Sequence, residues 1–272
     1  MGIKQTMQIG SYSDIKFSDY KKIPAVSNSY LGRLDHCPAS AKIEIEETPA
    51  MALGKAAHAY ILDCTTFDRD FAVAPACDRR TKAGKEAYAS FQVDNLNKII
   101  ITEEEFQQVK CIGAAVFEHP TAKVLLKDGA SEQTIIWNDH ETGLTCKSRI
   151  DRVPHDIDRV LVDLKTTRDA SERAFIRSCV SYGYIRQAAM YQEGYYFAAD
   201  AEIDKFVFIA VEPEPPYRVE VYDVDSDFLG WGYEEFHRLL RIEKECRIKG
   251  AYPHYQNAGA QVLVKPGYLN TY

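Results

Sequence analysis

The stretch "RVLVDLKTT", residues 159–167, has the composition of a buried β-strand, yet it carries a carboxylate and an ammonium group. Side chains alternate between the two faces of a strand, so Asp163 and Lys165 point to the same side. An ordinary ion pair on a solvated sheet would produce the same pattern. The neighbouring sequence must therefore decide between a structural pair and a functional one.

A hairpin is expected immediately before this strand. The segment "SEQTIIWN" (131–138) alternates as a strand, "DHETG" (139–143) is typical of a turn, and "LTCKSRIDRV" (144–153) reads as the second strand. If the second strand neighbours residues 159–167, Asp151 and Asp163 come close enough to share a hard cation. A divalent ion relieves their repulsion, and Mg²⁺ fits two carboxylates best.

Lys165 beside this carboxylate pair is consistent with a catalytic site. A lysine beside a metal-binding pair can orient or help to deprotonate a water molecule, and it can stabilise charge that grows on a phosphate. Hydrolysis of a phosphodiester needs both functions. The alternative remains open at this point, because Asp151 with Arg149 and Asp163 with Lys165 would also make ordinary ion pairs.

The bulk composition restricts the class of protein. The 272 residues are 46% hydrophobic and 27% charged, as in ordinary globular proteins. The seven cysteines include no C-x-x-C pair, which favours reduced thiols over a zinc ribbon or an iron–sulfur cluster. No apolar run is long enough for a membrane helix and no signal peptide is recognisable, so we expect a cytoplasmic protein. The net charge of −7 means that any DNA contact must use a local basic surface.

The order of the expected elements favours an α/β fold in which a mixed central sheet is flanked by helices. We expect a single domain over residues 1–272, with a helical N-terminal part to about 130, a sheet-containing core over about 131–225, and a C-terminal helix and tail over 226–272. Thr102 and Glu105 form a capping-box pattern at the start of one helix. The other expected helices and strands cover residues 28–34, 51–63, 171–180, 184–199, 205–212, 217–224 and 225–248.

Several motifs occur in the order found in one nuclease superfamily. With "RID" (149–151), "VDLKT" (162–166) and "QAAMY" (187–191), the sequence resembles the PD-(D/E)XK nucleases, and more narrowly the RecB-like and RecE-type phage or prophage exonucleases. Upstream, "AVSNSYLGRLDHCPA" (25–39) resembles the S-x-S-x-L helix of that group, and "LGKAAHAYIL" (53–62) resembles its G-x-x-x-H helix. The resemblance covers roughly residues 12–212 and implies a restriction-endonuclease-like core.

The resemblance also implies a set of site residues. Lys165 would be catalytic together with Asp163, Asp151 and Glu132, and the metal ligands would be His58, Asp151, Asp163 and the main-chain carbonyl of Leu164. Gln187 and Tyr191 would contact DNA or position the active site, and Arg149 and Arg168 would contact DNA. Each residue has an ordinary alternative: a helix histidine for His58, a surface acid for Glu132, helix packing for Gln187 and Tyr191, and a solvated basic face for Lys147, Arg149, Arg152, Arg168, Arg173, Arg177 and Arg186.

The function implied by the resemblance is that of a Mg²⁺-dependent deoxyribonuclease. It would act as an exonuclease on double-stranded DNA ends in phage-type recombination or repair, with Mn²⁺ as the alternative metal. A single-strand annealing protein is the implied partner and a homo-oligomeric ring the implied assembly, with no membrane association. The cysteine cluster of the iron–sulfur members is missing, so that cofactor is not expected. An endonuclease or repair nuclease, and a non-catalytic DNA-binding recombination protein with a degenerate site, are the alternatives; the intact D-x-K and His58 count against degeneracy.

Overall fold

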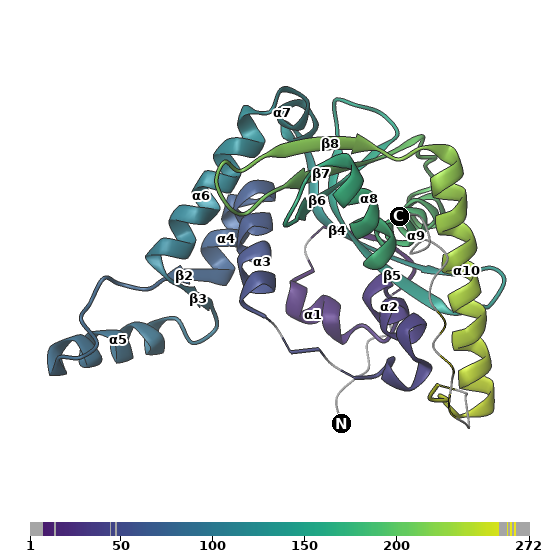
Figure 1. Cartoon of the computed structure of the whole chain (residues 1–272), viewed down its shortest axis with the longest axis horizontal. Coiled ribbons are helices and arrows are strands. Elements are labelled where there is room, and N and C mark those ends of the chain that lie inside the picture. The colour runs from purple at the N-terminus through teal and green to yellow at the C-terminus, as the bar shows by residue number, and fades with distance from the viewer. Residues whose placement is uncertain are drawn as a thin grey trace.

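A six-stranded mixed sheet lies at the centre of the structure, a computed structural model that describes residues 8–13, 15–43, 45–46, 48–255, 260, 262 and 264 (Figure 1). Strands β6 and β7 are parallel, and every other neighbouring pair in this sheet is antiparallel. The mixed sheet expected from the sequence is confirmed. Its strands, in spatial order, are β1 (Gly10–Tyr12), β4 (Gly129–Asn138), β5 (Thr145–Pro154), β6 (Val160–Thr166), β7 (Lys205–Val211) and β8 (Val219–Asp223).

Helices cover both faces of the sheet, because β6 and β7 are apolar on both sides. Leu161 and Phe208 face one core, which contains residues of α2, α8, α9 and α10, whereas Val162 and Ile209 face the other, which contains residues of α3, α6 and α7. These helices are α2 (Asn28–His36), α3 (Pro49–Leu62), α6 (Glu103–Glu118), α7 (Pro120–Leu126), α8 (Glu172–Ser181), α9 (Tyr184–Ala199) and α10 (Ser226–Lys249).

Local signals in the sequence set several helix ends. The Ser27 side chain caps α2, and Thr102 with Glu105 forms the expected capping box at the start of α6. A short 3₁₀ turn (Pro38–Ser40) lies where the proline indicates a second helix start, but other elements carry no clear pattern and are not expected from the sequence: β1, α1 (Phe17–Lys22) and α4 (Cys64–Asp70). They are three to seven residues long, too short for a periodic pattern to identify them.

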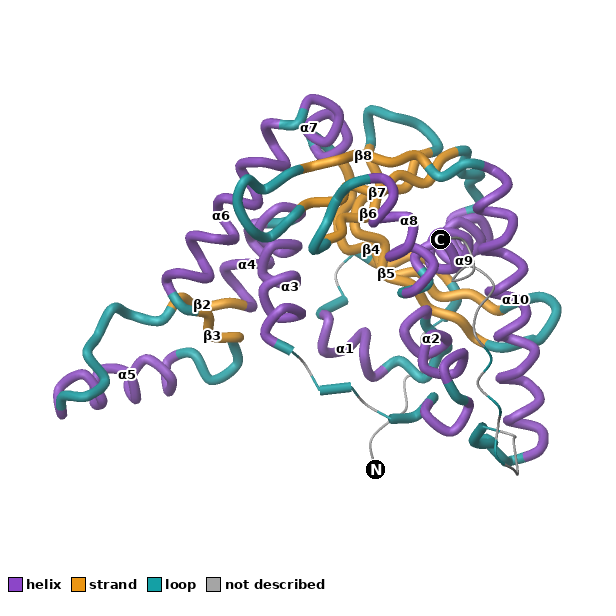
Figure 2. Tube along the Cα trace, in the orientation of Figure 1, coloured by secondary structure: helices purple, strands orange, loops and turns teal. Residues whose placement is uncertain are grey.

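A separate arm projects from the helical side of the molecule (Figures 1 and 2). Its base is a two-stranded parallel sheet of β2 (Phe71–Val73) and β3 (Ile99–Ile101). Between these strands the chain runs out and back through α5 (Lys82–Asp94), which Figure 2 shows at the far end of the arm. No helix or strand is expected from the sequence in this part of the chain, which is rich in polar residues.

Two expectations from composition concern the thiols and the membrane. All seven cysteines are free in the structure, and their reduced state stays a prediction. Among the residues that the structure describes, no helix has the length and apolar character needed to cross a membrane. Most of the expected C-terminal tail lies outside the described residues.

Candidate functional site

Asp151 lies at the point where β5 and β6 separate. The two antiparallel strands pair at Arg152 and Val162. Beside this pair, the hydrogen bond between the strands is accepted by the side chain of Asp151 and not by a backbone carbonyl. Its Oδ2 accepts the Leu164 N–H at 2.8 Å. The strands are therefore neighbours, as expected from the sequence, and the carboxylates of Asp151 and Asp163 are both buried beside the gap between them.

Asp163, Lys165 and Gln187 form a closed polar network. Lys165 Nζ lies 2.5 Å from Asp163 Oδ2 and donates a hydrogen bond of 3.0 Å to Gln187 Oε1. Gln187 Nε2 donates in turn to Asp163 Oδ1 at 2.6 Å. The ammonium also lies 4.6 Å from the centre of the Tyr184 ring, a cation–π contact that the sequence does not predict. Gln187 on α9 thus holds both functional groups of the D-x-K strand in place.

Helix α3 places His58 beside Asp151. The histidine Nδ1 lies 3.4 Å from Asp151 Oδ2, and one ligand atom from each of His58, Glu132 and Asp151 lies within 4.8 Å of the others. Helix α3 approaches β6 closely, since a Cβ at Gly54 would lie 3.0 Å from Thr166 Oγ1. Asp163, a further expected ligand, is outside this group of three and turns toward Lys165 and Gln187.

Glu132 has an unusual backbone for a strand residue. Its φ of 55° is in the left-handed region, although the residues on either side, Ser131 and Gln133, pair regularly with β5. The register places Glu132 across from Asp151. Its carboxylate accepts a short hydrogen bond from Arg149 Nε, and Arg149 also donates to the Ile15 carbonyl at 2.7 Å. Such an outlier is typical of functional sites, where the surrounding contacts hold a costly conformation in place.

The electrostatics of the site favour a bound cation. Burial, followed by the charges of Asp163 and Glu132, raises the pKa of Asp151 well above its usual range. Burial lowers the pKa of His58, which keeps the imidazole in the neutral form that binds metals. Burial also acts to lower the pKa of Lys165, but the charges of Asp163 and Asp151 outweigh it and raise this pKa. The ammonium is therefore the form that faces the two carboxylates.

The donor set fits a divalent metal. Three carboxylates face one lysine and one arginine, so the site carries excess negative charge when all three carboxylates are ionised and His58 is neutral. Asp163 Oδ2 is buried and, apart from its ion pair with Lys165, has no aligned hydrogen bond among the described residues. One imidazole and several carboxylate oxygens suit Mg²⁺ or Mn²⁺. His58, Glu132 and Asp151 would hold the ion, with the Asp163 carboxylate adjacent.

The remaining expected DNA-binding residues lie in different environments. Tyr191 is buried against Phe206, and Arg149 is turned inward toward Glu132. Arg168 is exposed on the loop after β6. Among the other basic residues of the expected phosphate track, Lys147, Arg152 and Arg186 are buried and bonded to protein groups, while Arg173 and Arg177 are exposed. A DNA-contacting role for Arg149, Arg168 and Tyr191 remains a prediction.

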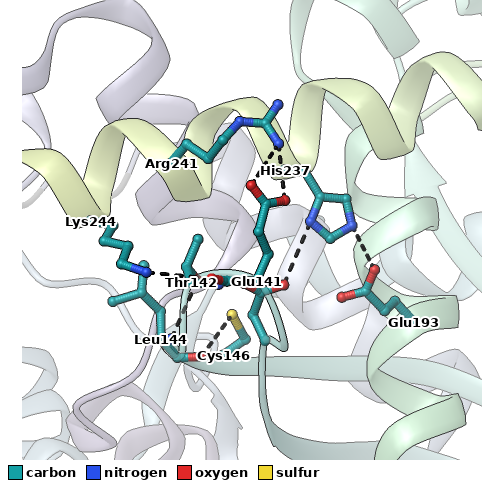
Figure 3. Close-up of polar contacts among 9 residues, drawn as sticks. Glu141, Thr142, Leu144, Cys146, Glu193, His237, Arg241 and Lys244 are labelled. Atoms are coloured by element: carbon teal, nitrogen blue, oxygen red, sulfur yellow. Dashed lines mark hydrogen bonds and ion pairs between the residues drawn. The ribbon is translucent and has the colours of Figure 1, made fainter.

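A second group of three potential metal ligands lies away from this site, where α10 meets α9 and the β4–β5 turn (Figure 3). His237 Nε2 is 2.8 Å from Glu193 Oε2, and His237 Nδ1 is 3.5 Å from Asp139 Oδ1. Both ring nitrogens face carboxylates, which is the arrangement of an imidazolium rather than of a metal-bound imidazole. This group therefore ties α10 to α9 and to the turn as an ion cluster.

The His237 cluster is expected to make stability depend on pH. The hydrogen bond to Glu193 raises the pKa of His237, so its contribution is complete below the unfolded pKa and is lost as the pH rises through the folded pKa. His237→Gln should lower the free energy of unfolding by about 1–3 kcal/mol near pH 5.5, with a smaller difference near pH 8.5. Urea unfolding of the variant and the wild type at both pH values measures this difference in the free energy of unfolding. The exposed His155, 3.6 Å from Asp128, supplies the control variant His155→Gln, which should show little difference. A difference that grows with pH would contradict the assignment.

A mixed sheet with an acidic strand, a D-x-K strand and a supporting histidine helix defines a PDDEXK-like nuclease fold, a class whose members use divalent metals. The chain belongs to the family described as PDDEXK-like domain of unknown function (DUF3799), whose model matches residues 17–261. No curated protein sequence is significantly similar to the chain.

Solved structures resemble the chain at low sequence identity. The crystal structure of a candidate exonuclease from Eubacterium rectale matches with a TM-score of 0.57 and 15% identity, covering 93% of this chain and 96% of that one. An alkaline exonuclease from Laribacter hongkongensis matches with a TM-score of 0.25 and 12% identity, covering 83% of this chain and 92% of that one. At 15% identity the first likeness establishes a shared fold, and the TM-score of the second is too low to carry weight.

Proposed function

We propose that the protein is a metal-dependent DNA exonuclease that hydrolyses phosphodiester bonds from double-stranded ends. The observation that carries the proposal is the group formed by His58, Glu132 and Asp151, whose ligand atoms lie within 4.8 Å of one another directly beside the paired Asp163 and Lys165. A metal site next to a buried lysine supplies the two functions that phosphodiester hydrolysis requires. Membership of a PDDEXK-like family supports the same chemistry.

Three residues of the chain would have separate roles in the reaction. Lys165 Nζ would orient the attacking water and stabilise charge on the scissile phosphate, since its ammonium is fixed by Asp163, Gln187 and the Tyr184 ring. Gln187 would act as a positioning residue through its two hydrogen bonds. Arg149 would hold the Glu132 carboxylate toward His58 and Asp151.

The metal would be Mg²⁺, with Mn²⁺ as the alternative. Carboxylate oxygens are the ligands that both ions prefer, and a single histidine is compatible with either. When bound, the cation would act as a Lewis acid that lowers the barrier to attack on the phosphate. It would also offset the burial and the repulsion from Asp163 and Glu132 that together raise the pKa of Asp151.

The cellular setting is a further part of the proposal and is supported by the sequence resemblance. We place the enzyme in phage-type recombination or repair, in the cytoplasm, acting as a ring-shaped homo-oligomer beside a single-strand annealing protein. The chain would form one nuclease domain over residues 1–272. The α9 position of Gln187 and the exposure of Arg168 are compatible with duplex DNA as the substrate.

A gel assay with Mg²⁺ tests the activity and separates the two modes of cutting. The purified protein is given linear duplex DNA and a matched covalently closed circle. We expect loss of the linear DNA alone, because an exonuclease needs an end. Lys165→Ala should abolish that loss, whereas Lys205→Ala at the exposed first residue of β7 removes the same charge away from the site and should not.

Each other outcome has a definite meaning. Cutting of the closed circle would replace the proposal with an endonuclease. A Lys165→Ala protein that degrades linear DNA at the wild-type rate would show that this site is not the active site. Failure to cut either substrate, with folded protein and either metal, would favour a DNA-binding protein without catalysis.

A further inference from the structure

The arm consists of residues 74–98, carried by β2 and β3, and it has almost no core of its own. Within α5 the one buried residue is Gly84. Figure 1 shows the helix well outside the layers formed by the central sheet and its covering helices. A helix of 13 residues is marginally stable alone in water, so an exposed helix of this length is better explained by a partner than by folding requirements.

The charge of the arm is opposite to that of the rest of the protein. Its outer end, made of the loop before α5 and the first turn of that helix, reads "RRTKAGK" (79–85), with four basic residues and no acidic one. Over residues 74–98 there are five basic and three acidic residues, whereas the whole chain has 33 basic and 40 acidic residues. The arm is therefore a local basic surface of the kind that an acidic protein needs in order to bind nucleic acid.

The four basic side chains of this stretch are exposed: Arg79 and Arg80 in the loop, and Lys82 and Lys85 in the first turn of α5. Arg79 lies 4.7 Å from the centre of the Tyr88 ring, and Lys82 is 3.9 Å from Glu86 in a solvated pair. Contacts of this kind are weak in water. The cations thus remain available to an external anionic partner.

The loop has a fixed conformation rather than being an open chain. The Asp78 side chain accepts the Arg80 N–H, and the Thr81 hydroxyl accepts the Gly84 N–H. A Cβ at Gly84 would lie 2.0 Å from the Asp78 carbonyl oxygen, so the loop packs directly on the first turn of α5. The basic residues are held at one end of the helix.

The base of the arm is joined to the helix that carries His58. Phe71 of β2 and Ile101 of β3 share a buried apolar cluster with Ala56 and Ala59 of α3. His58 lies between those two alanines in the sequence and points to the metal-binding group instead. A single helix thus connects the arm to the candidate active site.

We propose that the arm binds the phosphate backbone of duplex DNA, at a distance from the end being hydrolysed. The inference rests on the proposed function, because it takes duplex DNA as the substrate. The arm holds the duplex through charge and not through base contacts, so it adds affinity without sequence preference. The same arm carries two exposed apolar residues, Val93 and Leu96. The competing explanation is therefore that the arm contacts a second copy of this chain.

The test measures duplex binding without catalysis, by fluorescence anisotropy of a labelled duplex in metal-free buffer containing a chelator. The arm variant combines Arg79→Gln, Arg80→Gln, Lys82→Gln and Lys85→Gln. The matched control removes four exposed lysines elsewhere with Lys123→Gln, Lys127→Gln, Lys205→Gln and Lys249→Gln. Affinity is measured from about 50 to 200 mM salt, since each phosphate contact contributes about 0.9 to the slope of log affinity against log salt.

We expect the arm variant to bind at least about ten-fold more weakly at low salt, with a slope reduced by about 2 to 4, and the control to lose much less. Equal losses and slopes in the two variants would overturn the proposal. So would a change in sedimentation behaviour in the arm variant with unchanged DNA binding, because the arm would then be a contact between subunits. A wild-type protein that shows this arm-dependent binding but never cuts DNA would refute the proposed nuclease function alone.

Discussion

Asp163→Asn is expected to lower the rate of Mg²⁺-dependent DNA hydrolysis by about a thousand-fold or more. The amide has nearly the same shape as the carboxylate, so the fold is retained. It removes the negative charge that fixes Lys165 Nζ at 2.5 Å and that adds to the attraction for a cation. Single-turnover cleavage of a linear duplex measures the rate, and titration with Mn²⁺ followed by electron paramagnetic resonance measures metal affinity independently.

The control for this substitution is Asp139→Asn. Asp139 is also a buried aspartate that faces a basic side chain, His237, but it lies in the β4–β5 turn and belongs to the second cluster. The variant should lose stability while its cleavage rate remains close to that of the wild type. If the two variants reduced cleavage equally, the effect would reflect damage to the sheet, and Asp163 would have no special role.

Gly232→Ala is expected to destabilise the protein by about 3 kcal/mol. Gly232 lies where α10 crosses α9, and a Cβ there would be 2.5 Å from the Ile185 carbonyl oxygen. Because that atom belongs to the backbone, the two helices must move apart. Thermal unfolding should show a midpoint roughly 10 °C lower. Cleavage should also decline, since Gln187 is on the α9 segment that is displaced.

Gly230→Ala separates this packing effect from the general effect of replacing glycine in a helix. A Cβ at Gly230, two residues earlier in α10, would meet nothing within 4 Å. Alanine there should stabilise the helix by about 0.5–1 kcal/mol. Opposite signs for the two substitutions are the expected result, and a stabilising effect at both would mean that the α9–α10 crossing is looser than the structure shows.

The features of the fold that sequence could identify are those with local causes. The alternating residues around Asp163 and Lys165, the turn chemistry after Asn138 and the capping box at Thr102 each depend on neighbours within a few residues. The order of these elements then places Asp151 and Asp163 on adjacent strands. Gln187 and His58 were identified through the resemblance to a nuclease superfamily, because one histidine or one glutamine on a helix has no distinctive pattern.

The features that sequence did not identify depend on tertiary contacts. The left-handed backbone of Glu132 is held by the β4–β5 register and by Arg149, and no residue near it signals that conformation. The inward turn of Arg149, Arg152 and Arg186 likewise depends on partners far away in the sequence. The arm was missed for a different reason, since this part of the chain is rich in polar residues and its helix buries only Gly84.

The candidate site draws on distant parts of the chain, from His58 on α3 to Gln187 on α9, with the β4–β5 hairpin and β6 between them. During synthesis from the N-terminus, the hairpin and the D-x-K strand emerge while the chain segment that forms α9 is still inside the ribosome. Until α9 docks, Lys165 and Asp163 lack the side chain that connects them. A nascent chain would therefore complete this polar network only after α9 has left the ribosome and docked on the sheet.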